Sequence, residues 1–171
     1  MTGPASRCQA LGDFAELLSY PEADPASTAR RCRERVVARA RKHLDAFVDR
    51  AERAPRHALE EAFSAAFDLE PACAPYVGYH LCGDGPLRGQ FLAELAGVYA
   101  AAGFTPPGAT AELPDHLAVV LRFLAGTPGG EARDALLEDG LAPALERMLG
   151  AFEGSDNPYR FVLAALREEL R

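Results

Sequence analysis

The segment Glu112-Leu113-Pro114-Asp115-His116 brings two carboxyl groups and one imidazole close together along the chain. Proline followed by aspartate is a common helix start, because proline suits the first helical turn and aspartate complements the positive end of the helix dipole. Alternatively, Glu112, Asp115 and His116 face a groove and accept hydrogen bonds from a basic peptide. The spacing alone favours the capping interpretation and leaves peptide binding open.

A second candidate site lies in the segment 71–86, where three prolines and three glycines interrupt any long helix. Tyr76 and Tyr79 lie in this segment, and Arg88 and Gln90 follow it directly. Aromatic side chains in a segment of this kind either fill the core or line a hydrophobic groove for a partner helix. In the second case Arg88 or Gln90 would stand at the rim of the groove.

A metal site is the alternative for an enzymatic function, because Cys73, His80, Cys82 and His116 carry ligands that suit zinc. Their spacing lacks the second closely spaced pair of a typical zinc site, so buried thiols are the preferred interpretation. The sequence also contains no glycine-rich phosphate loop and no familiar hydrolase motif. We therefore predict no catalytic residue, no bound metal and no cofactor.

Composition describes an ordinary globular protein, with 49% hydrophobic and 25% charged residues. The net charge of -7 disfavours nucleic acid and favours basic peptides as partners. No segment resembles a signal peptide or a membrane span, and the four cysteines form no closely spaced pair. These features predict a protein of the cytoplasm with free thiols and no stable membrane insertion.

Apolar residues recur at spacings of three and four residues, which predicts an all-α fold. We expect one globular bundle of seven or eight helices over residues 1–171. The predicted helices cover approximately residues 11–18, 25–53, 59–67, 87–102, 114–124, 131–152 and 157–171, and the sixth is kinked or split near Gly140 and Pro143. The helix at 114–124 is apolar on nearly every face, so it is predicted to be central.

The predicted helix over 25–53 begins with Asp24-Pro25, a typical N-cap and first-turn pair. It also carries a run of basic residues, for which a solvated face is the preferred interpretation and partner docking is the alternative. These residues are Arg30, Arg31, Arg33, Arg35, Arg39, Arg41 and Lys42.

Three strings, in this order, resemble a known family. They are Phe14-x-x-Leu17-Leu18-x-Tyr20-Pro21, then Gly83-Asp84 with Arg88-Gly89-Gln90, and then Glu112-Leu113-Pro114-Asp115-His116-Leu117. The chain is similar to the maturation chaperones of molybdenum-cofactor oxidoreductases, the NarJ/TorD/DmsD family. Within that family it most resembles the nitrate reductase delta-subunit branch and the related chaperones of type II dimethyl-sulfoxide-reductase-like enzymes.

The resemblance implies an all-helical chaperone, and the lack of catalytic motifs predicts that it is not an enzyme. Its partner would be the molybdopterin-containing catalytic subunit, bound at an N-terminal twin-arginine leader or a remnant of one while the cofactor is inserted. The resemblance also implies peptide-binding roles for Asp115 and His116, with Glu112 beside them. Tyr76, Arg88 and Gln90 would form the opposite wall, and Tyr79 is a further candidate peptide-binding residue. A generic helical scaffold is the remaining alternative.

Overall fold

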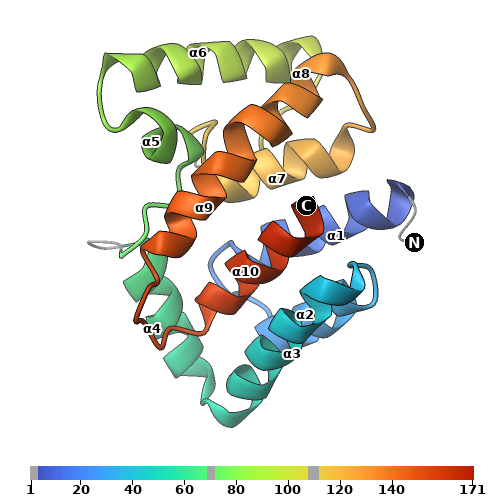
Figure 1. Cartoon of the computed structure of the whole chain (residues 1–171), viewed down its shortest axis with the longest axis vertical. Helices are drawn as coiled ribbons and strands as arrows, with labels where there is room; N and C mark the ends of the chain where they lie inside the picture. Colours follow the sequence, from blue (N-terminus) through green and yellow to red (C-terminus); the bar gives the residue numbers. More distant parts are fainter. Residues whose placement is uncertain (1–3, 69–71, 108–111) are drawn as a thin grey trace.

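The first half of the chain forms a group of four helices that the last helix joins. The computed structural model describes residues 4–68, 72–107 and 112–171. The helices of this group are α1 (Pro4–Leu17), α2 (Pro25–Arg33), α3 (Ala38–Arg53), α4 (Arg56–Phe67) and α10 (Tyr159–Leu170). α10 packs along α3, and α2 packs against both α1 and α3 (Figure 1). The chain therefore ends beside the helices with which it begins.

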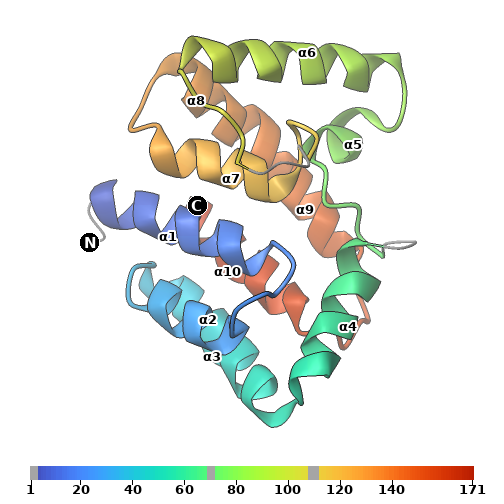
Figure 2. The ribbon, with the colours of Figure 1, turned by 180° about the vertical axis from the view of Figure 1, so that it is seen from behind.

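The second group of helices is joined to the first through α7, which packs along α1. Its elements are α5 (Val77–Cys82), α6 (Pro86–Ala101), α7 (Leu117–Gly126), α8 (Glu131–Ala135), the π-helical segment η1 (Leu136–Leu141) and α9 (Ala142–Gly150). Both views place α7 between α1 and α6, and α6 forms the outer edge of the molecule (Figures 1 and 2). The predicted all-α class is confirmed for the described residues, which contain no strand longer than an isolated bridge.

The described chain has more helical segments than the seven or eight that we predicted, because the helix over 25–53 is divided, α5 is additional, and the stretch from Glu131 to Gly150 consists of three segments. The predicted helix over 25–53 ends at Arg33 and restarts at Ala38, so that prediction was wrong. Val36 turns into the core and is fully buried, and the Val37 N–H donates to the Glu169 carboxylate at 2.8 Å. This bond to α10 holds the chain in an extended conformation between α2 and α3.

The predicted helix over 131–152 runs without a gap from Glu131 to Gly150, and the irregularity expected near Gly140 is the π-helical segment η1 within it. The segment 71–86, in which prolines and glycines were predicted to interrupt any long helix, contains one short helix, α5. Asp24 caps α2 as predicted, because its carboxylate accepts hydrogen bonds from the N–H groups of Ala26 and Ser27.

The core is continuous through both groups, and α7 is buried on several sides as the sequence predicted. Tyr159 at the start of α10 is fully buried and packs against the rings of Phe47, Phe63 and Phe67. All four cysteines are free thiols. Within the described ranges, no helix has the length and apolar character required to cross a membrane.

Part of the basic run has a buried partner, which corrects the interpretation of a purely solvated face. The Asp13 side chain on α1 is only 5% exposed and accepts hydrogen bonds from Arg31 at 2.8 Å and from Arg35 at 2.6 Å. Arg31 also contacts Glu16, one turn further along α1. These ion pairs join α1 to the end of α2, so the two arginines serve the fold.

Candidate functional site

The two predicted site segments meet in a short antiparallel bridge. The Val77 N–H donates to the Asp115 carbonyl, and the Leu117 N–H donates to the Pro75 carbonyl, both at 2.8 Å. This bridge places Tyr76 opposite His116 just before the starts of α5 and α7. The two rings pack edge to face with their centroids 5.5 Å apart. Residues that lie far apart in the sequence thus form one site.

Asp115 and Arg88 form a buried ion pair beneath this bridge. The Arg88 Nε donates to Asp115 Oδ2 at 3.0 Å and Nη2 donates to Oδ1 at 3.3 Å, which is a bidentate geometry. The Asp115 side chain is fully buried, and the Arg88 side chain is 13% exposed. The hydrogen bond that Arg88 donates to Asp115 raises the pKa of Arg88, so the guanidinium stays charged. It also lies over the Tyr76 ring, 5.0 Å from its centroid.

His116 is the N-cap of α7, which corrects the prediction that this helix starts at Pro114 with Asp115 as the capping acid. Its Nδ1 accepts a hydrogen bond from the Ala118 N–H at 3.2 Å. The Tyr99 hydroxyl on α6 donates to the Pro114 carbonyl at 2.9 Å. Asp115 instead turns toward Arg88 of α6. The short segment before α7 is thus bonded to α6 through Asp115 and Pro114, and to α7 through His116.

Four of the seven predicted site residues therefore share one cluster: Tyr76, Arg88, Asp115 and His116. Glu112 is exposed, and its charge acts on the pKa of both Tyr76 and His116, so it lies beside the cluster. Tyr79 is 43% exposed and packs against the His80 ring, and Gln90 is exposed on α6. Arg88 occupies the acceptor atoms of Asp115, so the exposed acids near this cluster are Glu112 and Asp84, which also pairs with Arg88.

The candidate metal ligands do not converge. His80 Nε2 lies 2.7 Å from the Ala74 carbonyl and 3.9 Å from Cys73 Sγ, whereas Cys82 is exposed. Burial raises the pKa of the Cys73 thiol to about 12, which disfavours the thiolate that a metal needs. In the part of the chain that the structure covers, no three potential ligands lie close enough to hold a metal ion.

Gly78 is a site residue that sequence reasoning missed. A Cβ atom at this position would lie 2.7 Å from Phe91 Cδ1 and 2.8 Å from Asp115 Oδ2. The absence of a side chain lets α5 approach both α6 and the buried ion pair. One glycine within an apolar segment is the only sequence signal, and it does not reveal which neighbours require the space.

Replacing Gly78 with Ala should lower the free energy of unfolding by about 1–3 kcal/mol, because the methyl group overpacks this contact. Gly89→Ala is the matched control, since Gly89 lies in α6 and its Cβ would meet nothing within 4 Å. That change should raise stability by roughly 0.5–1 kcal/mol, because alanine favours a helix over glycine. Equal urea midpoints for the two variants would contradict the close approach.

Stability should fall as the pH drops from about 7.5 to about 5.5, partly because of His116. Burial lowers the pKa of His116, and the Glu112 carboxylate opposes this shift only in part. The folded protein therefore disfavours the charged ring, whereas the unfolded chain binds a proton near pH 6.5, so stability is lost below about that pH. His43 and His80 shift in the same direction through burial.

The contribution of His116 can be isolated with His116→Asn, which keeps an N-cap side chain that does not titrate. We expect the variant to lose part of the pH dependence, up to about 1.4 kcal/mol per pH unit. Urea unfolding at both pH values measures this difference. Identical pH profiles for the two proteins would show that the ring does not titrate differently on unfolding.

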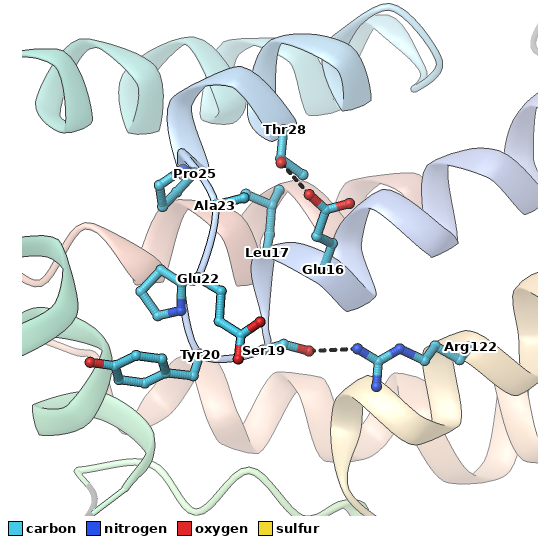
Figure 3. Close-up of a pocket in the computed structure, with 10 residues that line it drawn as sticks. Glu16, Leu17, Ser19, Tyr20, Glu22, Ala23, Pro25, Thr28 and Arg122 are labelled. Atoms are coloured by element: carbon cyan, nitrogen blue, oxygen red, sulfur yellow. Dashed lines mark hydrogen bonds between the residues drawn. The ribbon is translucent and has the colours of Figure 1, made fainter. Parts of the chain in front are cut away.

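A cavity of about 420 Å³ lies beside the loop between α1 and α2. Tyr20 and Pro21 line it, and Arg122 of α7 donates to Ser19 Oγ at 2.9 Å across it (Figure 3). Tyr20 is 51% exposed and packs edge to face on Phe63. The Leu-x-Tyr-Pro string thus shapes the surface beside α1 and α7, and Tyr20 connects it with Phe63 of α4.

Comparison with known proteins agrees with this architecture. The model of the family "nitrate reductase delta subunit" matches residues 33–165. No curated protein matches the sequence significantly. A crystal structure from Archaeoglobus fulgidus, assigned as a redox enzyme maturation protein, superposes with a TM-score of 0.68 at 21% identity, over 95% of this chain and 91% of that one. That structure supports the fold, and the family match covers most of the sequence. The expectation that the protein is not an enzyme is confirmed by its family. The chain belongs to the nitrate reductase delta subunit family, a family of maturation chaperones.

Proposed function

We propose that this protein is a cytoplasmic chaperone for the catalytic, molybdopterin-containing subunit of an oxidoreductase such as a nitrate reductase. The observation that carries this proposal is the family match over residues 33–165. The chaperone would hold the catalytic subunit while the molybdenum cofactor is inserted and before export or membrane attachment. The whole chain would act as one unit, since its two helix groups share a continuous core.

We further propose that the N-terminal leader of the catalytic subunit, or its remnant, binds over the Tyr76–His116 bridge. Tyr79, Gln90 and Glu112 are exposed, and Tyr79 and Glu112 lie close to the bridge along the chain, so these side chains can contact a peptide. A twin-arginine leader supplies two guanidinium groups, which suit a carboxylate and the faces of aromatic rings. The buried pair of Arg88 and Asp115 would hold these contacts in position, and His116 would act through its cap and its contact with Tyr76.

Titration calorimetry with the N-terminal segment of the catalytic subunit tests leader binding. We expect heat of binding and a Kd at or below about 10 µM. Glu112→Lys and Tyr79→Ala should each weaken binding by about tenfold, because each removes an exposed contact for a guanidinium group. Glu153→Lys on the α9–α10 loop is the matched control, since Glu153 is also exposed. No heat at high micromolar concentration would refute binding of the leader.

A further inference from the structure

A shallow groove of about 350 Å³ lies where the end of α3 meets α4 and the loop before α10. The junction of α3 and α4 forms the lower tip of the molecule, and α6 forms the opposite edge (Figures 1 and 2). Arg50 and Arg53 line the groove, and Asp156 is the one acid among the described residues that line it. We call this the α3–α4 groove. Its apolar lining consists of Ala54, Ala58, Leu59, Ala62 and Pro158.

The guanidinium groups of Arg50 and Arg160 are held in place beside this groove without being neutralised. Both lie over the Phe161 ring of α10, at 4.9 Å and 4.6 Å from its centroid. Arg50 donates a hydrogen bond to the Asp156 carbonyl at 3.1 Å, and Arg160 donates one to the Ser155 carbonyl at 2.9 Å. An aromatic ring and two neutral carbonyls orient the two arginines and leave their positive charge available to a partner.

These arginines differ from those of the basic run in α2 and the start of α3. Five arginines of that run pair with carboxylates of α1, α3 or α10, namely Arg30, Arg31, Arg33, Arg35 and Arg39. By contrast, Arg50, Arg53 and Arg160 take part in none of the ion pairs formed by the described residues. In a chain with a net charge of -7, this surface thus gathers three uncompensated positive charges.

The residues around the groove favour a short acidic peptide over a broad anionic surface. Arginine presents a planar fork of N–H donors that matches a carboxylate. Asp49 and Glu52 lie next to the arginines along α3, and Asp156 lies in the groove itself. A membrane or a nucleic acid would meet these acids as well, and the negative net charge of the protein would repel it. A short peptide can contact the arginines and the apolar lining alone.

We propose that the α3–α4 groove binds an acidic segment of a protein partner, in which carboxylates flank an apolar side chain. The carboxylates pair with Arg50 and Arg53, and the apolar side chain packs on Ala58 and Leu59. Arg160 adds positive charge beside the groove. This surface shares no residue with the Tyr76–His116 cluster, so the proposal goes beyond leader binding and the chaperone function.

Fluorescence anisotropy with a labelled synthetic peptide tests the groove in the full-length protein. The probe has about ten residues, with glutamates on both sides of a central leucine. We expect a Kd below about 200 µM in about 0.05 M salt, and binding at least fivefold weaker in about 0.5 M salt because the charges are screened. No change in anisotropy up to about 1 mM protein in the lower salt would overturn the proposal.

Arg53→Glu should weaken binding of this probe by about tenfold, because it replaces an attraction with a repulsion. Arg53 is exposed and in no ion pair, so the variant should fold normally, which circular dichroism checks. Lys42→Glu is the matched control, since Lys42 is also exposed on α3, does not line the groove, and gives the same change in net charge. Equal losses for both variants would show a general effect of charge and would overturn the site.

Two further probes define the partner. Lysines in place of the glutamates should abolish binding, and serine in place of the leucine should weaken it by about threefold, because the apolar contact is lost. Cosedimentation of the native protein with vesicles that contain phosphatidylglycerol, without binding of the acidic peptide, would assign the arginines to a membrane surface and overturn the acidic segment. Arg53→Glu should leave titration with the leader peptide unchanged, so failure of either proposal is seen separately.

Discussion

Replacing Arg88 with Met should lower the free energy of unfolding by about 3–5 kcal/mol, because it leaves the Asp115 carboxylate buried without its partner. The Asp115 side chain is fully buried, and two hydrogen bonds from Arg88 satisfy it. Methionine retains a long apolar stem, so the loss should come from the charge and its hydrogen bonds. The contact with the Tyr76 ring is lost as well. Urea unfolding monitored by circular dichroism measures the difference.

Asp84→Ala is the control for this result. Asp84 also pairs with Arg88, but its side chain is 80% exposed, and exposed pairs contribute only about 0–1 kcal/mol. The contrast depends on burial, since both acids contact the same guanidinium. A loss below about 1 kcal/mol for Arg88→Met would show that this ion pair does not hold α6 against the segment before α7.

Asp13→Ala should lower the free energy of unfolding by about 2–3 kcal/mol, less than the full effect of breaking a buried pair. Asp13 is 5% exposed and binds both Arg31 and Arg35, which are 42% and 31% exposed. The two arginines are partly hydrated already, so water can replace some of the lost contacts. Chemical denaturation of the purified variant provides the measurement.

Glu34→Ala gives the comparison for that experiment. Glu34 pairs with Arg33 near the same end of α2, but its side chain is 75% exposed. We expect a change within about 0.5 kcal/mol for this exposed position. Similar losses for Asp13→Ala and Glu34→Ala would mean that burial of Asp13 does not strengthen the link between α1 and α2.

The parts of the fold that local patterns determine were predictable. Apolar residues on nearly every face of 117–124 predicted a central helix, and the structure buries this segment as α7. The division between α2 and α3 was not predictable, because it depends on the bond between Val37 and Glu169. These residues lie 132 positions apart in the sequence, and no local propensity reports such a contact.

The candidate site shows the same limit. The sequence drew attention to Asp115 and His116, and the structure places both at the meeting point of α5, α6 and α7. Their local roles depended on partners that spacing does not identify. Asp115 pairs with Arg88 from 27 residues away, which leaves His116 rather than the aspartate to cap α7. The need for Gly78 likewise became visible only when α5 was packed against Phe91.

The most direct test of the proposed function is to purify the tagged protein from its own cells and to identify its partners by mass spectrometry. We predict that the catalytic subunit of a molybdenum-dependent oxidoreductase copurifies in near-stoichiometric amount, and that this subunit contains less molybdenum than the mature enzyme. Recovery of the protein without any such subunit, from cells that are producing the oxidoreductase, would contradict the account.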